Sequence, residues 1–141
     1  MQVFVPFPSP FDVAKCLDRK RLLKQVTECG QILSAISGAS KGWRRHPVTR
    51  MYAPYFEYLN AYHACLLSYA HEDMDSAIQW NDYSFLVRPP FLTDEFCDQH
   101  KRRLYTKAPD LYPQFAGYGT SEENWYVVDG NLLKYINGKQ I

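Results

Sequence analysis

The segment from Ser9 to Gly38 constrains the fold most, because it carries signals for both ends of a long helix. Ser9 suits the N-cap, Pro10 suits the first helical position, and Asp12 can complete a capping box. Gly38 is typical of the residue that follows a helix C-terminus. We therefore predict one central N-terminal helix that runs from about residue 9 to residue 37.

This predicted helix has an apolar face and a polar face. At about 100° per residue the apolar arc consists of Leu22, Val26, Cys29 and Leu33, is extended by Leu23 and Cys16, and includes Arg19. The polar stripe consists of Asp18, Arg21, Gln25 and Glu28 and is bordered by Leu17 and Ile32. Apolar borders on both sides of the stripe predict a helix that is largely enclosed. The position of Arg19 within the apolar arc also predicts that Arg19 is buried.

Two more helical regions follow the Gly/Ser-rich stretch SGASKGWRRHP. The second begins near Pro47, is interrupted at Pro54 and resumes through residues 55–70. Its buried stripe is predicted to be Phe56, Leu59, His63 and Leu66, which makes His63 a core residue and not a ligand. The third is capped by Thr93, has Asp94 and Glu95 in its first turn, and ends in basic residues from 101 to 107.

The chain ends in a hairpin pattern. Residues 125–128 and 131–136 are rich in β-formers, and the Asp129-Gly130 pair between them is typical of a type I′ turn. At 141 residues, 46% of them hydrophobic, the chain can bury one core. We expect a mainly α, compact helical single domain spanning residues 1–141, with a short C-terminal β-hairpin.

Composition limits the possible cofactors and locations. The four cysteines are far apart and form no C-x-x-C pair, so we expect reduced, mostly buried thiols, with no metal and no cofactor. No apolar run approaches the roughly 18 residues that span a bilayer, and the N-terminus lacks a signal-peptide pattern. We expect a cytoplasmic monomer without a membrane partner.

Charge is segregated along the chain, although the net charge is only +1. Residues 15–50 contain nine Lys or Arg against two carboxylates, a net of +7, and residues 51–100 contain one Arg against eight carboxylates, a net of −7. A second basic cluster follows at residues 101–107. This distribution favours a surface that attracts a polyanion, while mutual neutralisation of the two halves remains the alternative.

No P-loop, Rossmann fingerprint, G-x-S-x-G or H-E-x-x-H motif is present in the sequence. What remains is a helix that combines guanidinium groups, an amide and two carboxylates, followed by a cationic set with a titratable imidazole, Trp43-Arg44-Arg45-His46-Pro47 and Arg50. Arginines bind phosphates, a carboxylate serves as a base, and aromatic rings stack on an extruded base. Such residues suit an enzyme that acts on a nucleotide's glycosidic bond, and equally a protein that only binds.

Three segments resemble a known family. VFVPFPSPFDVAKCLDRKRLLKQVTECGQIL, GWRRHPVTRMY and HKRRLYTKAPDLYPQF resemble, in order, the pyrimidine-dimer DNA glycosylases of the phage endonuclease type, and most closely their uncharacterised bacterial and phage branch. The resemblance spans roughly residues 1–116 and does not extend to the tail. It implies an all-helical protein that bends damaged DNA.

The resemblance also implies a chemistry, from which this sequence departs. Enzymes of the family attack the sugar with the α-amine of a small residue at position 2 and form an imine, helped by a glutamate and arginines on the first helix. Position 2 is Gln here, a bulky residue that normally retains the initiator methionine. The nearest acids are Asp18 and Glu28. A lyase step would need Met1 or Lys20 as the amine, and otherwise Asp18 or Glu28 could activate water.

We therefore predict a DNA-acting N-glycosylase, a hydrolase with a possible lyase step, that excises a damaged or modified base from double-stranded DNA in repair. The alternatives are a non-catalytic nucleic-acid or nucleotide-binding module, and an enzyme acting on a small nucleotide. The predicted catalytic residues are Asp18, Glu28 and His46. The predicted substrate-binding or phosphate-binding residues are Arg19, Arg21, Lys24, Gln25, Arg44, Arg45, Arg50, His100, Arg103, Lys107 and Tyr112.

The polar stripe and the later loop are expected to form one site. Because the stripe needs partners to cover it, and residues 43–50 offer donors together with an aromatic ring, we predict that one cavity joins the two. The residues expected to converge there are Asp18, Arg21, Gln25, Glu28, His46 and Arg50.

Overall fold

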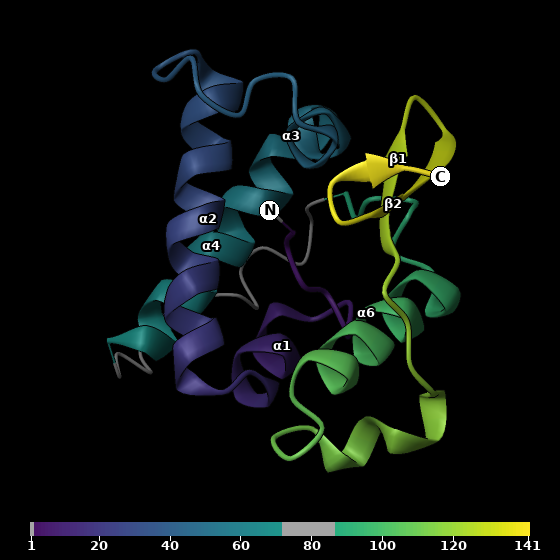
Figure 1. Ribbon diagram of the computed structural model, residues 1–141. Helices are drawn as coiled ribbons and strands as arrows, with labels where there is room; N and C mark the ends of the chain where they lie inside the picture. The colour runs from purple at the N-terminus through teal and green to yellow at the C-terminus, as the bar shows by residue number, and fades with distance from the viewer. Residues whose placement is uncertain (1, 72–86) are drawn as a thin grey trace.

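The computed structural model describes residues 2–71 and 87–141. Residues 71–90 form an acidic stretch that its paired prolines predict to be irregular, and most of this stretch lies outside the described residues. In chain order, the helices are α1 (Pro10–Cys16), α2 (Arg19–Ser37), α3 (Pro47–Tyr52), α4 (Phe56–Ala70) and α6 (Asp94–Lys107), with 3₁₀ turns at Ala53–Tyr55 and Pro113–Tyr118. The strands are β1 (Asn124–Val128), β2 (Asn131–Ile136) and β3 (Lys139–Gln140). The expected mainly helical fold with a small C-terminal sheet is confirmed (Figure 1).

The predicted single helix from residue 9 to residue 37 is wrong, because it is two helices. Leu17 and Asp18 are extended, with ψ angles of 135° and 157°, and separate α1 from α2. Asp18 caps α2 by accepting a hydrogen bond from the Arg21 amide, and it also accepts one from the Tyr112 hydroxyl. A carboxylate that competes for backbone amides in this way stops one helix and starts the next. The predicted end is confirmed, since Gly38 is left-handed with φ 85°.

Helices α2 and α4 pack against each other and carry much of the core (Figure 1). Leu22, Cys29 and Leu33 of the predicted apolar arc are buried, but Leu23 is exposed. In α4, Leu59 and Leu66 are fully buried and His63 is half-buried, whereas Phe56 is exposed and does not belong to the buried stripe.

The prediction that Arg19 is buried is wrong. Arg19 is exposed in the first turn of α2, and its Nη2 donates to the carbonyl oxygen of Ala70 at 3.1 Å. Ala70 is the last residue of α4, so the apolar arc reaches the end of its partner helix at this point. A side chain there reaches water and supplies a donor to one of the unpaired C-terminal carbonyls.

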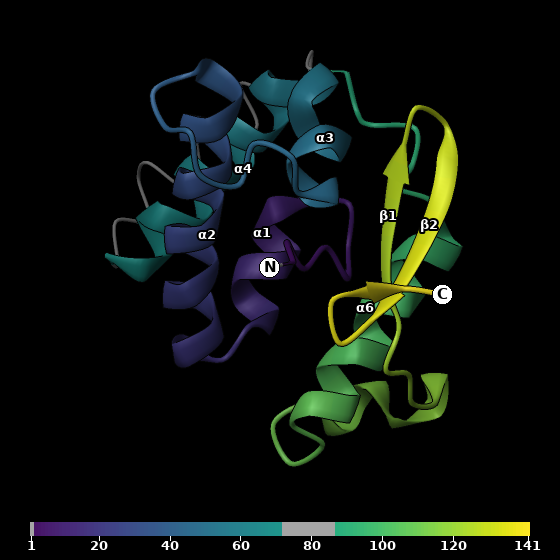
Figure 2. The ribbon, with the colours of Figure 1, turned by 45° about the horizontal axis from the view of Figure 1, so that its top comes forward.

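An extended N-terminal segment, residues 2–8, runs through the middle of the molecule between α2 and α6 (Figure 2). It belongs to no sheet, and side chains bind its backbone instead. The amide of Val5 donates to His100 Nδ1 at 2.8 Å, and the carbonyl oxygen of Phe4 accepts from the Tyr62 hydroxyl at 2.6 Å. Val3 and Val5 are buried, so this segment joins the two halves of the fold.

The predicted hairpin is confirmed, and a third strand extends it. β1 and β2 are antiparallel, and Asp129 and Gly130 between them have φ angles of 52° and 79°, as a type I′ turn requires. Asn137 and Gly138, with φ 51° and 77°, form a second such turn that leads to β3. This sheet lies beside α6 and α3 (Figure 2).

The predicted cap of the third helix is confirmed as well, since Thr93 Oγ1 accepts from the amide of Phe96 at 3.2 Å. The cysteines Cys29, Cys65 and Cys97 are buried and Cys16 is half-buried, and all four are free thiols. Within residues 2–71 and 87–141, no helix is long and apolar enough to cross a membrane.

Candidate functional site

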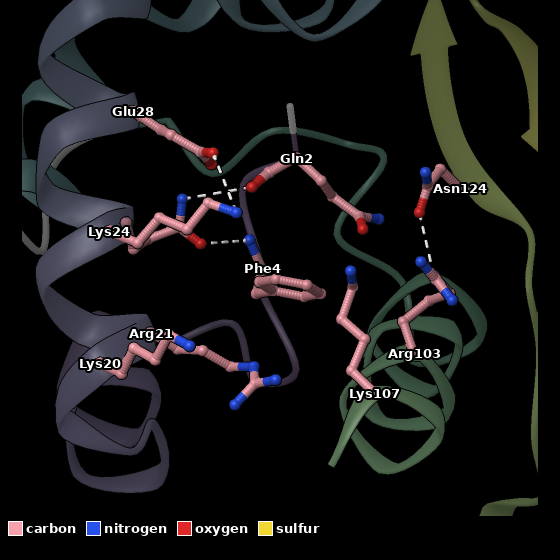
Figure 3. A pocket seen from close by; sticks show the side chains of 10 residues that line it. Gln2, Phe4, Lys20, Arg21, Lys24, Glu28, Arg103, Lys107 and Asn124 are labelled. Atoms are coloured by element: carbon pink, nitrogen blue, oxygen red, sulfur yellow. Dashed lines mark hydrogen bonds and ion pairs between the residues drawn. The ribbon is translucent and has the colours of Figure 1, made fainter. Parts of the chain in front are cut away.

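A cavity of about 250 Å³ opens between α2, the N-terminal segment, α6 and the start of β1 (Figure 3). Three turns of α2 line one side, because residues three and four apart share a helix face. The lining residues are Gln2, Phe4, Lys20, Arg21, Lys24, Gln25, Glu28, Arg103, Lys107 and Asn124. Five of these are basic and Glu28 is the single carboxylate among them, so the lining carries a net charge of +4.

Gln25 shapes this cavity by holding the N-terminal segment against α2. Its side chain is 2% exposed; its Oε1 accepts from the amide of Phe4 at 2.7 Å, and its Nε2 donates to the carbonyl oxygen of Gln2 at 3.3 Å. Both ends of the amide are therefore used by the protein itself. Gln25 was predicted to bind substrate, but its observed contacts are with the backbone of residues 2 and 4.

Glu28 faces the cavity from the third turn of α2. Its side chain is 17% exposed and its Oε1 lies 4.0 Å from Lys24 Nζ, while the Lys24 side chain is 71% exposed. A carboxylate that is mostly buried beside a solvent-exposed ammonium can accept a proton or stabilise a cation in the cavity. Of the three predicted catalytic residues, only Glu28 is among the residues that line the cavity.

Arg103 and Lys107 face Glu28 from α6. Arg103 is 7% exposed, and its Nε donates to Asn124 Oδ1 at 2.9 Å while its Nη1 donates to the Ser121 carbonyl at 2.9 Å. Lys107 has no hydrogen bond or ion pair within the described part of the chain, and Figure 3 shows its amine pointing into the cavity. Burial and the nearby cations Arg103, Lys24 and Arg21 lower its pKa, against the opposing effect of Glu122.

Asp18 lies outside the cavity lining. Burial alone would raise its pKa, but hydrogen bonds from Tyr112 and Arg21 and the charge of Arg21 together hold the pKa below its usual value. Tyr112 is fully buried, and its hydroxyl also accepts from the Asp18 amide at 3.1 Å. Through these contacts, Asp18 and Tyr112 connect the start of α2 to the segment after α6.

His100 is buried, connects α6 to the N-terminal segment, and does not line the cavity. It is 1% exposed, and its Nδ1 accepts from the amide of Val5. Burial, with a smaller contribution from Arg103, lowers its pKa to about 3. The imidazole is therefore neutral at physiological pH, as an acceptor for a backbone amide must be.

The loop before α3 is a separate cationic surface, which we call the tryptophan loop (residues 41–46). Trp43 is 45% exposed with φ 63°, an unusual value for a bulky side chain, and Arg44 and Arg45 beside it are exposed. His46 Nδ1 accepts from the amide of Val48 at 3.1 Å and so caps α3. The His46 ring lies edge-on to Trp43, and burial lowers its pKa to about 4.

Six residues were predicted to converge in one cavity, and three of them line the observed cavity. Arg21, Gln25 and Glu28 line it, whereas Asp18, His46 and Arg50 do not, so the prediction of one shared cavity is wrong for these last three. The reason is local. Asp18 and His46 each cap a helix, and the exposed side chain of Arg50 reaches Asp129 in the hairpin turn at 3.8 Å.

Three lining residues were not among the predicted site residues: Gln2, Phe4 and Asn124. Lys20 was predicted as a possible amine and does line the cavity, whereas the other predicted amine, that of Met1, lies outside the described residues. Helical spacing explains the position of Lys20, which lies four residues before Lys24 on the same face of α2. Gln2 and Phe4 had no local signal, because their position depends on contacts with α2, α4 and α6. Asn124 lies in the tail, beyond the segments of resemblance.

A family model described as pyrimidine dimer DNA glycosylase matches residues 1–72. The chain belongs to the pyrimidine dimer DNA glycosylase family. The match includes α1, α2, α3 and α4, and with them the α2 side of the cavity, while the α6 and β1 sides lie beyond it. No curated protein and no solved structure matches the chain.

A glycosylase of this family needs to bind an anionic polymer and to act on one sugar. The cavity lining combines five cationic side chains with the Glu28 carboxylate. Among the described residues there is no group of three or more His, Cys, Asp or Glu that could hold a metal ion.

Proposed function

We propose that this protein excises a damaged or modified base from double-stranded DNA, and that the cavity between α2 and α6 is its active site. The observation that carries this proposal is a carboxylate enclosed by cations in a cavity built on the family-matched helix α2. Because the cavity holds about 250 Å³, it suits one nucleotide taken out of the helical stack, as enzymes that act on bases require.

The cations have the task of holding phosphates. Lys20 and Lys24 reach the cavity from exposed positions on α2, and Arg21 adds a guanidinium group that can contact two phosphate oxygens. The tryptophan loop adds Arg44, Arg45 and an exposed indole for the flanking DNA. An exposed aromatic side chain between cations suits stacking against an unpaired base or a kinked step.

Glu28 is the proposed catalytic carboxylate. Loss of the base leaves positive charge on the sugar, and a mostly buried carboxylate stabilises that charge because the local dielectric is low. In a hydrolytic route, Glu28 takes a proton from the water that attacks C1′ and the departing base keeps the electron pair of the C1′–N bond. Asp18, the other predicted acid, is already engaged with Tyr112 and Arg21.

A lyase route needs an amine, and we propose Lys107 Nζ for it. It has no hydrogen bond or ion pair within residues 2–71 and 87–141, and its amine points into the cavity. Its pKa is lowered, so a larger fraction of the amine is the neutral nucleophile. Its lone pair bonds to C1′ while the base leaves with the C1′–N pair. One amine proton then passes to O4′ as the sugar ring opens to the imine. In the lyase step a base takes the C2′ proton, a C1′–C2′/C2′–C3′ rearrangement of the electron pairs forms a double bond to C3′, and the C3′–O3′ bond breaks with its electron pair leaving on the 3′ phosphate. Water finally hydrolyses the imine and regenerates the amine.

The test is incubation with duplexes that carry diverse lesions and modified bases, with and without borohydride. We expect base release from at least one duplex. Release with a trapped covalent complex supports the amine route, and Lys107→Arg should then abolish trapping while it keeps DNA affinity. Release without trapping favours water activated by Glu28.

The alternatives are outcomes of the same experiment. DNA binding without base release from any duplex would reject the enzyme and favour the binding module. Turnover of free nucleotides but not of duplexes would favour the small-nucleotide enzyme. A cytoplasmic, monomeric state remains a prediction, which gel filtration and cell fractionation would test.

A further inference from the structure

The side chain of Gln2 is buried without a hydrogen-bond partner. It is 8% exposed, and neither its Oε1 nor its Nε2 is paired among the described residues. A buried amide without partners is costly, because it has given up water and gained nothing in exchange. Such a group marks a place where a ligand can supply the missing bonds.

Hydrogen bonds fix the backbone beside this side chain, so they also fix the position from which the side chain enters the cavity. Gln25 binds the carbonyl oxygen of Gln2 and the amide of Phe4. Figure 3 shows the Gln2 side chain extending from the N-terminal segment toward Asn124. It lines the same cavity as Glu28 and Lys107.

The other amides of the lining are already occupied. Gln25 uses both ends of its amide on the N-terminal segment, and the Oδ1 of Asn124 accepts from Arg103. Among the lining amides, the Gln2 carboxamide is therefore the one that offers a donor and an acceptor together.

That pair of groups selects the class of ligand. A phosphate only accepts, and the cations of the cavity already suit it. The Gln2 carboxamide has a donor beside an acceptor. It can therefore form two hydrogen bonds with a nucleobase edge that has an acceptor beside a donor, such as an amide or amidine edge. The aromatic ring of Phe4 adds a surface on which a base can stack.

We propose that Gln2 is the specificity-determining contact of the cavity and reads the donor–acceptor edge of an extruded base. This inference rests on the proposed function, since it assigns the base as the group that enters the cavity. It separates the task of recognising the base from the tasks of the cations and of Glu28.

The test compares Gln2→Met with wild type. Both side chains are bulky, so processing of the initiator should not differ, and Met has nearly the length of Gln without its polar atoms. The free Gln2→Met protein should melt about 2 °C or more higher, because an unpaired amide is removed. Gln114→Met, on the exposed 3₁₀ turn, is the control and should change neither stability nor binding.

The binding probes are five duplexes that differ at one position. In four of them, one of the four bases lies opposite an abasic analogue, and in the fifth, the base-free duplex, both strands carry the analogue. Wild type should bind at least one base about 10-fold more tightly than the base-free duplex. Gln2→Met should lose this preference and keep its affinity for the base-free duplex.

Three results would overturn the inference: no base preference in wild type, a preference that survives Gln2→Met, or a lower melting temperature in Gln2→Met. The last would mean that Gln2 serves the fold. Base excision is measured separately on the same duplexes. If excision is absent while the Gln2-dependent preference remains, the proposed function fails by itself; if excision occurs without that preference, the Gln2 inference fails by itself.

Discussion

The cavity and the tryptophan loop contain similar residue types but hold them differently. In the cavity, Gln25 and Arg103 are buried and fixed by hydrogen bonds at 2.7–3.3 Å. In the loop, Trp43, Arg44 and Arg45 are exposed. Fixed side chains suit chemistry on one sugar, because catalysis needs precise placement. Exposed cations suit the DNA backbone, which is bound through charge more than geometry.

The largest effect should come from the cavity carboxylate. Glu28→Gln keeps the shape of the side chain and removes its charge, so the single-turnover rate of base release should fall at least about 100-fold. DNA affinity should hold or rise, because a negative charge leaves a cationic cavity. Glu57→Gln, in the exposed first turn of α4, is the matched control. If Glu28→Gln releases the base at the wild-type rate, Glu28 is not the catalytic carboxylate and the cavity is not the active site.

The second effect concerns pH and sharpens the contrast between buried and half-buried histidines. His100 has a pKa near 3 in the folded protein against an ordinary value of 6.5, so the unfolded chain binds a proton that the folded chain refuses. The contribution of His100 to the free energy of unfolding should therefore be fully present above pH 6.5 and decrease as the pH falls from 6.5 toward about 3. Urea titrations across this window measure the proton uptake.

Two variants separate the contributions to that curve. His100→Gln should reduce proton uptake on unfolding by about one across the window. His46→Gln, in the loop, should reduce it only between pH 6.5 and about 4, because the pKa of His46 falls less far. Equal curves for the two variants would contradict the difference in burial on which the comparison rests.

The third effect tests the loop alone. If Arg44 and Arg45 bind phosphates, Arg44→Gln with Arg45→Gln should lower the slope of log affinity against log salt by about two. Fluorescence anisotropy with one labelled duplex at several salt concentrations measures this. Lys139→Gln, at an exposed position on β3, is the control for the loss of one positive charge away from the loop. An unchanged slope in the double variant would show that the loop does not contact DNA.

The smallest effect is expected at Arg19. Because this side chain is exposed and makes one hydrogen bond to a helix-terminal carbonyl, Arg19→Ala should change the free energy of unfolding by no more than about 0.5 kcal/mol. Thermal and urea unfolding provide the measurement. A loss above about 2 kcal/mol would restore the interpretation of a buried arginine.

Features that depend on a few neighbouring residues could be predicted from the sequence. Thr93 caps α6, Gly38 ends α2, and Asp129-Gly130 forms the hairpin turn, since each acts through its own side chain or its own φ angle. The third strand could have been predicted from Asn137-Gly138 by the same rule. The basic face of α2 could also be predicted, because helical spacing brings Arg21, Lys24 and Glu28 together.

Only the tertiary structure decided where these local elements meet. The helix break at Asp18 involves Tyr112, 94 residues later, and the path of the N-terminal segment depends on Gln25, Tyr62 and His100. Such contacts have no period along the chain, so no pattern of spacing reveals them. For the same reason the sequence indicated one wall of the cavity, on α2, whereas folding supplied Gln2 and Phe4 and the opposite wall from α6 and β1.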